Sequence, residues 1–128
     1  IMMGDYNVEP YHDAVVHHLQ SSREKDLVLK KAPHVLYNPC WKFLISSQYN
    51  LVKPKAGTYY YPSGAFNRWH TIDQILFSQG FLSGEWVLND DDVTIVDIDL
   101  LMTAYESEIK YNVSDHLPIS AVLTRKLP

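Results

Sequence analysis

The sequence predicts a protein of the α/β class, because strand-like apolar runs occur on both sides of an amphipathic helical pattern. One strand-like run opens the chain at residues 1–3, and others cover residues 69–78 and 119–123. Around residues 10–20, apolar side chains recur four positions apart, which is the spacing of one helix face. The chain has 128 residues, of which 46% are apolar and 20% charged, so it suits one domain of ordinary globular composition.

The first third of the chain is predicted to be mainly helical after its opening strand. Pro10 suits the first turn of the helix predicted over residues 10–20. Residues 21–31 are highly charged and predict a loop that leads into a short helix. Residues 36–44 are rich in aromatic side chains and contain Asn38-Pro39, which predicts a turn followed by a short buried helix or strand.

The middle of the chain predicts strands separated by polar connections. Residues 58–61 are strand-like, and residues 62–68 form a loop just ahead of the next strand-like run. Residues 85–88 and 93–98 predict two strands that are joined by the acidic segment 89–92. This acidic segment lacks the spaced oxygen ligands and terminal glutamate of a calcium loop, so a polar hairpin turn is predicted there. Residues 101–108 fit either a loop or a short helix.

Polar side chains that can carry chemistry lie beside three of the predicted strands. Asp5 and Asn7 follow the first strand, and Asp73 interrupts an otherwise apolar run. Asp115 and His116 stand together just before the closing strand. A carboxylate inside an apolar run needs a partner, because an unpaired charge is costly to bury. Together these residues supply a base, an amide, metal-binding carboxylates and an imidazole, which is the set that phosphate-ester hydrolysis requires.

Three motifs in this order resemble those of the endonuclease/exonuclease/phosphatase superfamily, the metal-dependent phosphoesterases that include DNase I-like and exonuclease III-like enzymes. Residues 4–7, Gly-Asp-Tyr-Asn, are similar to the family's Gly-Asp-Phe-Asn motif. Residues 72–76, Ile-Asp-Gln-Ile-Leu, resemble its Ile-Asp-Tyr-Ile-Leu-type strand, and residues 114–118, Ser-Asp-His-Leu-Pro, resemble its Ser-Asp-His-x-Pro signature. The aromatic segments and the tryptophan ahead of Asp73 resemble a bacterial branch of this superfamily.

The resemblance implies a role for each residue of the set. Asp5 would be the general base or the carboxylate that positions the attacking water, and Asn7 would hold the phosphate or that water. Asp115 would bind Mg²⁺ directly or through water, with Mn²⁺ as a substitute, because these ions accept hard oxygen ligands. His116 would stabilise charge on the phosphoryl oxygens. Asp73 would accept a hydrogen bond from His116 and keep the imidazole oriented and charged.

The resemblance also implies an architecture, a four-layered α/β sandwich of two packed mixed β-sheets flanked by helices. Residues 1–128 would be the C-terminal part of such a domain, with the N-terminal half absent. That half normally supplies a metal-binding glutamate and a further asparagine, so we expect the chain to be inactive alone. An isolated half would expose a sheet face, which either the N-terminal half or a second copy would cover.

The function expected from this resemblance is hydrolysis of a phosphodiester, as in a nuclease, or of a phosphomonoester. The alternative is a catalytically inactive binding or scaffold protein that retains the fold. Taken singly, Asp5, Asn7 and Asp115 could merely form caps or turns. Arg68 could contact phosphate or be an ordinary surface arginine, and Trp69 could line a substrate cleft or pack in the core.

Charge and cysteine content limit the partners and the compartment. The net charge of −4 argues against a broad nucleic-acid-binding surface, although the N-terminal half could change that balance, and nucleic acid stays a possible substrate. Cys40, the single cysteine, excludes an internal disulfide, which favours a reducing, cytoplasmic compartment. No apolar run is long enough for a membrane-spanning helix.

Overall fold

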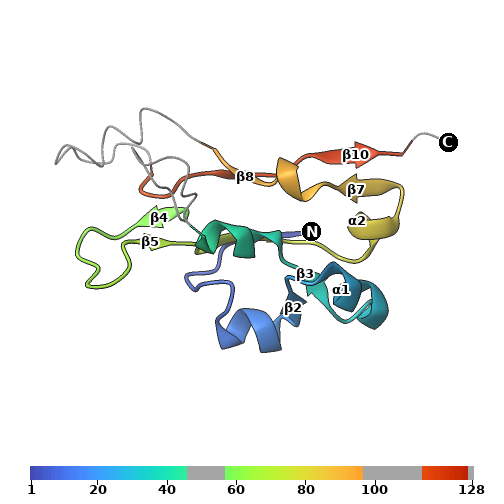
Figure 1. Ribbon diagram of the computed structural model, residues 1–128, viewed down its shortest axis with the longest axis horizontal. Coiled ribbons are helices and arrows are strands. Elements are labelled where there is room, and N and C mark those ends of the chain that lie inside the picture. The colour runs from blue at the N-terminus through green and yellow to red at the C-terminus, as the bar shows by residue number, and fades with distance from the viewer. Residues whose placement is uncertain (46–56, 97–113, 127–128) are drawn as a thin grey trace.

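The protein is described by a computed structural model that covers residues 1–45, 57–96 and 114–126 (Figure 1). Its helices and small mixed sheets place these residues in the α/β class, as the sequence predicts. The strands are β1 Met2–Asp5, β2 Ser21–Ser22, β3 Leu36–Tyr37, β4 Tyr59–Tyr60, β5 Trp69–His70, β6 Asp73–Leu76, β7 Trp86–Leu88, β8 Thr94–Ile95, β9 Ile119–Ser120 and β10 Leu123–Arg125. The helices are a π-helical turn Ala14–His18, α1 Lys25–Lys31, α2 Gly80–Ser83 and the 3₁₀-helices Pro39–Leu44 and Asp90–Asp92.

Strand β6 is the element to which several distant segments attach. Along one edge it pairs antiparallel with β1, in a register that runs from Met2 opposite Leu76 to Asp5 opposite Asp73. Along its other edge, the backbone N–H groups of Asp73, Ile75 and Phe77 donate to Thr58 Oγ1, Cys40 Sγ and the Tyr37 carbonyl oxygen, at 3.2, 3.3 and 2.8 Å. Because both edges are satisfied, the backbone that carries Asp73 is held firmly in place.

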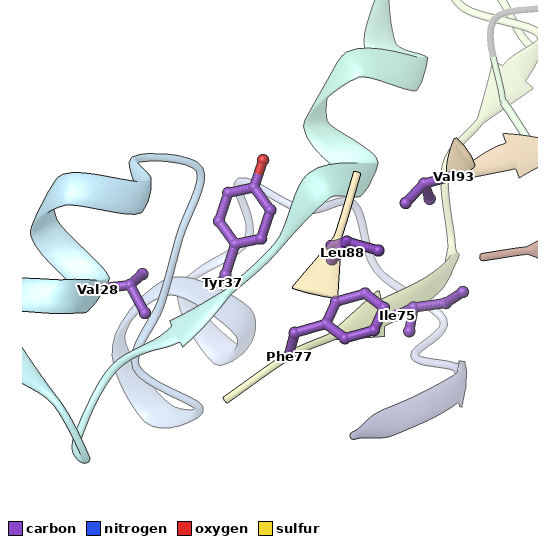
Figure 2. Close-up of a cluster of buried hydrophobic side chains, with 6 residues drawn as sticks. All are labelled: Val28, Tyr37, Ile75, Phe77, Leu88 and Val93. Carbon is purple, nitrogen blue, oxygen red and sulfur yellow. The ribbon is translucent and has the colours of Figure 1, made fainter. Parts of the chain in front are cut away.

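The hydrophobic core lies on the face of β6 that also carries Asp73. Side chains alternate along a strand, so Asp73, Ile75 and Phe77 share one face while Gln74 lies on the other. Figure 2 shows Ile75 and Phe77 in the core cluster, which consists of Val28, Tyr37, Ile75, Phe77, Leu88 and Val93. Burial of such side chains contributes roughly 1.5–3 kcal/mol each, so this cluster is a principal source of stability. Asp73 therefore lies at the end of the same strand face that carries Ile75 and Phe77 in the core.

Figure 1 shows the β4–β5 hairpin, whose second strand ends shortly before Asp73, the first residue of β6. Tyr59 pairs with His70 on one side and forms an isolated bridge with His116 on the other. Gly57 lies directly against the backbone of His70, where a Cβ atom would come within 2.3 Å of the carbonyl oxygen. Only glycine fits this close approach, so Gly57 fixes how the hairpin is seated.

The predicted helix over residues 10–20 is wrong in extent, because only residues 14–18 are helical and Pro10 is buried ahead of them. The helix cannot continue past Gln20, whose φ of 51° is left-handed. The Gln20 carbonyl instead accepts a hydrogen bond from the N–H of Leu36 at 2.8 Å, beside the parallel β2/β3 pair. Tertiary pairing thus ends the helix earlier than the apolar pattern predicts. The short helix predicted within residues 21–31 is present as α1.

The predicted hairpin around residues 89–92 is also wrong. Strand β7 pairs with β10, and β8 pairs with β9, so these two strands pair with the C-terminal segment and not with each other. Asp90 explains part of this, because it accepts from the Tyr37 hydroxyl at 2.9 Å and pairs with Lys25 Nζ at 2.7 Å. These contacts hold the acidic segment against α1 and β3, so it acts as a packing element. The strand predicted over residues 119–123 is divided into β9 and β10, and residues 101–108 lie outside the described part of the chain.

Strand β1 is exposed along its whole length. Met2 is 43% and Met3 60% exposed, although β6, its partner, is largely buried. Within residues 1–45, 57–96 and 114–126, no helix has the length and apolar character that crossing a membrane requires.

Candidate functional site

Asp5 is positioned by a tight turn at the end of β1. The backbone N–H of Asn7 donates to Asp5 Oδ1 at 2.8 Å, across two positions of the chain. Asn7 has a φ of 55°, a left-handed conformation that asparagine tolerates better than most residues. The sequence Asp-Tyr-Asn therefore forms a turn that orients the Asp5 carboxylate, and both side chains remain exposed.

Asp73 lies directly opposite Asp5 in the β1/β6 ladder. The N–H of Tyr6 donates to the carbonyl of Ile72 at 2.9 Å, which makes the next pair, Asp5 and Asp73, one without mutual backbone hydrogen bonds. Side chains are closest at such pairs and share one face of the sheet. Like charges directly opposite each other are destabilising, so these two carboxylates need a cation or a donor nearby.

His116 supplies a donor at this position. Its Nδ1 lies 2.8 Å from Asp73 Oδ2, and the two side chains are 25% and 18% exposed. An ionised carboxylate only accepts hydrogen bonds, so Nδ1 carries the proton in this hydrogen bond. Nε2 is then the ring nitrogen that remains for a contact with another group. The hydrogen bond between Asp73 and His116 predicted from the sequence is therefore confirmed.

The imidazole is held from several sides. The N–H of His116 donates to Ser114 Oγ at 3.1 Å, and the ring of Tyr59 lies 5.0 Å from the imidazole, centroid to centroid. The next residue, Leu117, is buried, and its N–H donates to the Thr58 carbonyl at 2.7 Å. Thr58 also accepts from the N–H of Asp73, so this one residue ties both halves of the pair together.

Asp5, Asp73 and His116 form a cluster in which one ligand atom from each lies within 4.8 Å of the others. Two carboxylates and an imidazole form a donor set that accepts Mg²⁺ through oxygen and Mn²⁺ through oxygen or nitrogen. The like charges of Asp5 and Asp73 add a physical reason for a cation to bind here. Asp115, the metal ligand expected from the sequence, is exposed and lies beside the cluster, with Oδ1 3.9 Å from His116 Nε2.

A second carboxylate–imidazole pair lies nearby and was missed by the sequence reasoning. Glu9 Oε1 is 3.0 Å from His70 Nδ1, and Glu9 Oε2 accepts from the N–H of Thr71, also at 3.0 Å. No motif marks Glu9, and the only signal was that a glutamate between Val8 and Pro10 would need a partner if that turn were buried. The ring of Tyr59 lies between the two imidazoles in the strand order, 6.4 Å from His70.

Arg68 and Trp69 line an open pocket of about 400 Å³ beside the loop that joins β4 and β5. Arg68 Nη1 donates to the hydroxyl of Tyr60 at 3.3 Å, and the ring of Tyr60 lies 5.1 Å from that of Trp69. Neither Arg68 nor Trp69 belongs to the Asp5–Asp73–His116 cluster, whereas Glu9 lines their pocket and also pairs with His70. The structure therefore places Arg68 and Trp69 in this pocket and not in the cluster.

A buried amide network supports the cluster from below. Gln74 is fully buried, donates through Nε2 to the Val8 carbonyl at 2.7 Å and accepts from Asn38 Nδ2 at 2.8 Å. Asn38 Oδ1 in turn accepts from the N–H of Cys40 at 3.0 Å.

Burial raises the pKa of the Cys40 thiol to about 11, outweighing the N–H of Ile75 and the Lys42 ammonium, which lower it. Cys40 is thus a protonated structural thiol at neutral pH.

Comparisons with known proteins found no match among family models, curated proteins or solved structures.

Proposed function

We propose that the protein is a metal-dependent phosphoesterase of the endonuclease/exonuclease/phosphatase type, which hydrolyses a phosphodiester or phosphomonoester by attack of water. The observation that carries the proposal is the convergence of Asp5, Asp73 and His116, three residues from three distant segments, within 4.8 Å. The sequence motifs that suggest this chemistry contain these same residues. A merely structural role for Asp5 would not require it to face a second carboxylate.

Asp5 accepts the proton of the attacking water or holds that water in line with phosphorus. Its Oδ1 is fixed by the Asn7 N–H, which leaves Oδ2 for the water. The exposed Asn7 side chain then hydrogen-bonds a phosphoryl oxygen or the same water. Because the turn holds the carboxylate before substrate arrives, little reorganisation is needed at the reactive centre.

His116 stabilises the charge that grows on the phosphoryl oxygens. Its Nδ1–H donates to Asp73, so Nε2 is the nitrogen that donates to the substrate once the ring is protonated. Asp73 fixes the ring plane and holds the proton on Nδ1, in the manner of a carboxylate that orients a catalytic histidine. Asp73 thus acts through His116.

Mg²⁺ or Mn²⁺ would be held by the Asp5 and Asp73 carboxylates, with Asp115 as a further oxygen ligand. Bound there, the ion would supply Lewis-acid stabilisation of the phosphoryl group and acidify a water. The donor set fits a hard divalent ion, and the paired carboxylates have a mutual repulsion that such an ion removes.

The four-layered sandwich belongs to the same proposal. The Met2 and Met3 side chains point to opposite faces of β1 and are both exposed, although β6 beside them is buried, which supports a segment that covers this outer strand. We propose that the N-terminal half of the domain covers β1, with self-association as the alternative. Light scattering of the purified chain, alone and mixed with that half, distinguishes the two.

The test is a panel of phosphate esters assayed with Mg²⁺ on the complete protein that carries this chain. The panel contains an aryl phosphodiester, an aryl phosphomonoester, single-stranded DNA and RNA. Asp5→Asn and His116→Ala should each lower turnover by about 10²–10⁴-fold. The matched controls are Asp91→Asn and His17→Ala, which change an exposed acid and an exposed histidine outside the cluster. Metal-independent turnover, or turnover that is unchanged in both cluster variants, would reject the proposal.

A further inference from the structure

The pocket beside the loop that joins β4 and β5 has the composition of a site for a planar ring. Its volume is about 400 Å³, within the range of small-molecule sites. Three of its lining residues are aromatic, two are oppositely charged, and the remaining two are an amide and an aliphatic residue. The full lining is Glu9, Tyr11, Leu44, Phe66, Asn67, Arg68 and Trp69.

The loop that borders the pocket is closed by its own backbone and presents Phe66 outward. The N–H of Tyr61 donates to the Arg68 carbonyl at 2.6 Å, and the N–H of Gly64 donates to the Tyr61 carbonyl at 3.1 Å. A Cβ atom at Gly64 would lie 2.1 Å from the carbonyl oxygen of Asn67, so the turn requires glycine. Phe66, at the tip of this closed loop, is 99% exposed. A phenyl ring held in water by a specific turn is well placed to stack on a ligand.

The two charged residues of the pocket, Glu9 and Arg68, are held by hydrogen bonds and can each form more. Glu9 is held by His70 and Thr71 through one hydrogen bond at each oxygen, and its side chain is 16% exposed. Each ionised oxygen can still accept a second hydrogen bond, such as one from an amino group. Among the described residues, Arg68 uses one of its five N–H donors, on Tyr60.

The pocket is connected to the Asp5–Asp73–His116 cluster along two chain segments. Trp69 precedes Asp73 by four positions, and Glu9 follows Asp5 by four. Four residues span at most about 14 Å when fully extended. Because this is an upper limit on the distance between the Cα atoms, one molecule can reach both places, with its phosphoryl group at the cluster and a ring in the pocket.

We propose that this pocket binds the nucleobase of the substrate, so that the phosphate ester cleaved at the cluster is that of an amino-bearing nucleotide. This inference rests on the proposed phosphoesterase function. Phe66 and Trp69 stack on the base, Glu9 accepts from its exocyclic amino group, and Arg68 donates to a ring acceptor or to the phosphate. Aromatic rings with a carboxylate also suit a quaternary ammonium group, but the Arg68 guanidinium repels a cation. A base has no such conflict.

The test is isothermal titration of the purified protein in EDTA with adenosine monophosphate, inosine monophosphate, ribose 5-phosphate and phosphocholine. Adenosine monophosphate should bind about tenfold more tightly than ribose 5-phosphate, because stacking is the added interaction. Phe66→Ala should remove that advantage. Because the Phe66 side chain is fully exposed, this substitution should not affect folding. Tyr61→Ala is the matched control, because Tyr61 is an exposed aromatic of the same loop outside the pocket lining.

Inosine monophosphate replaces the amino group by a carbonyl and tests Glu9. The wild type should prefer the adenosine nucleotide, and Glu9→Gln should abolish this preference, since its amide can donate as well as accept. Equal binding of adenosine monophosphate and ribose 5-phosphate, no effect of Phe66→Ala, or tighter binding of phosphocholine would overturn the assignment. Base-dependent binding without turnover of any ester would uphold the pocket and reject the phosphoesterase proposal. Turnover of all esters alike, unaffected by Phe66→Ala, would uphold the phosphoesterase proposal and reject the assignment of the pocket to a nucleobase.

Discussion

Asp5 and Asp73 face each other across the β1/β6 ladder as a pair without mutual backbone hydrogen bonds, the arrangement that brings cross-strand side chains closest. A sheet would ordinarily avoid two like charges at such a pair. The repulsion is offset on one side by His116, which is hydrogen-bonded to Asp73. Asp5 has no cation at a comparable distance among the ion pairs of the described residues, so the pair remains electrostatically unbalanced.

A divalent cation should therefore stabilise the fold. Millimolar Mg²⁺ or Mn²⁺ should raise the melting temperature, because an ion that binds only the native state shifts the unfolding equilibrium. Asp5→Asn should raise the melting temperature slightly in EDTA and should abolish the further rise with metal. Differential scanning calorimetry measures both effects, with Asp91→Asn as the control. A metal response that survives in Asp5→Asn would exclude the cluster as the binding site.

The hydrogen bond between Asp73 and His116 should matter for catalysis more than for folding. Asp73→Asn keeps an oxygen acceptor for Nδ1–H but removes the negative charge that faces the imidazole. We expect turnover at saturating Mg²⁺ to fall about 10–100-fold, as for other residues that orient an active-site group. The melting temperature should change little, because the side chain is near the edge of the core.

A matched control for this experiment is Glu9→Gln, which alters the second carboxylate–imidazole pair in the same way. Its effect should appear in the KM of a nucleotide substrate and leave the kcat largely unchanged. If Asp73→Asn also changed only KM, His116 would be a binding residue and its assignment as an electrostatic stabiliser would be wrong.

The predictable parts of the site are those that local sequence determines. The strand at residues 72–76 and the Asp-Tyr-Asn turn follow from short-range alternation and turn chemistry, and the lone acid Asp73 indicated a buried partner. The Glu9–His70 pair was missed because it joins positions 61 residues apart and neither residue lies in a motif. The partners of β7 and β8 were missed because nothing in those short strands distinguishes one neighbour from another. Long-range pairing is decided by the whole core.

Gln74 should be essential to stability, although the motif around it gives no hint of its role. Gln74→Leu keeps the volume but leaves the Val8 carbonyl and Asn38 Nδ2 without partners in a buried setting. Each of these two unsatisfied groups costs about 1–3 kcal/mol, so the free energy of unfolding should fall by about 2–6 kcal/mol. Urea denaturation measures this, and Gln79→Leu, which removes one surface hydrogen bond to Ser83, should change it by less than about 0.5 kcal/mol. Equal effects of the two substitutions would show that the buried network does not stabilise the fold.

Cys40 should make stability fall as the pH rises above 9. Its thiol has a pKa of 9.0 in an unfolded chain and about 11 in the folded protein, mainly because it is buried. Between these values the folded state binds more protons than the unfolded state, so stability must decrease with pH across this window. A shift of this size corresponds to about 2–3 kcal/mol, which is fully present below pH 9 and lost once the pH passes 11.

The variant Cys40→Ala lacks the titration, and it also loses the acceptor of the Ile75 N–H, an offset that does not depend on pH. The difference in unfolding free energy between wild type and Cys40→Ala, measured by urea denaturation at pH 8, 9, 10 and 11, should therefore shrink in steps as the pH increases. A difference that stayed constant from pH 8 to 11 would mean that the thiol titrates alike in both states, and that its burial does not favour the protonated form.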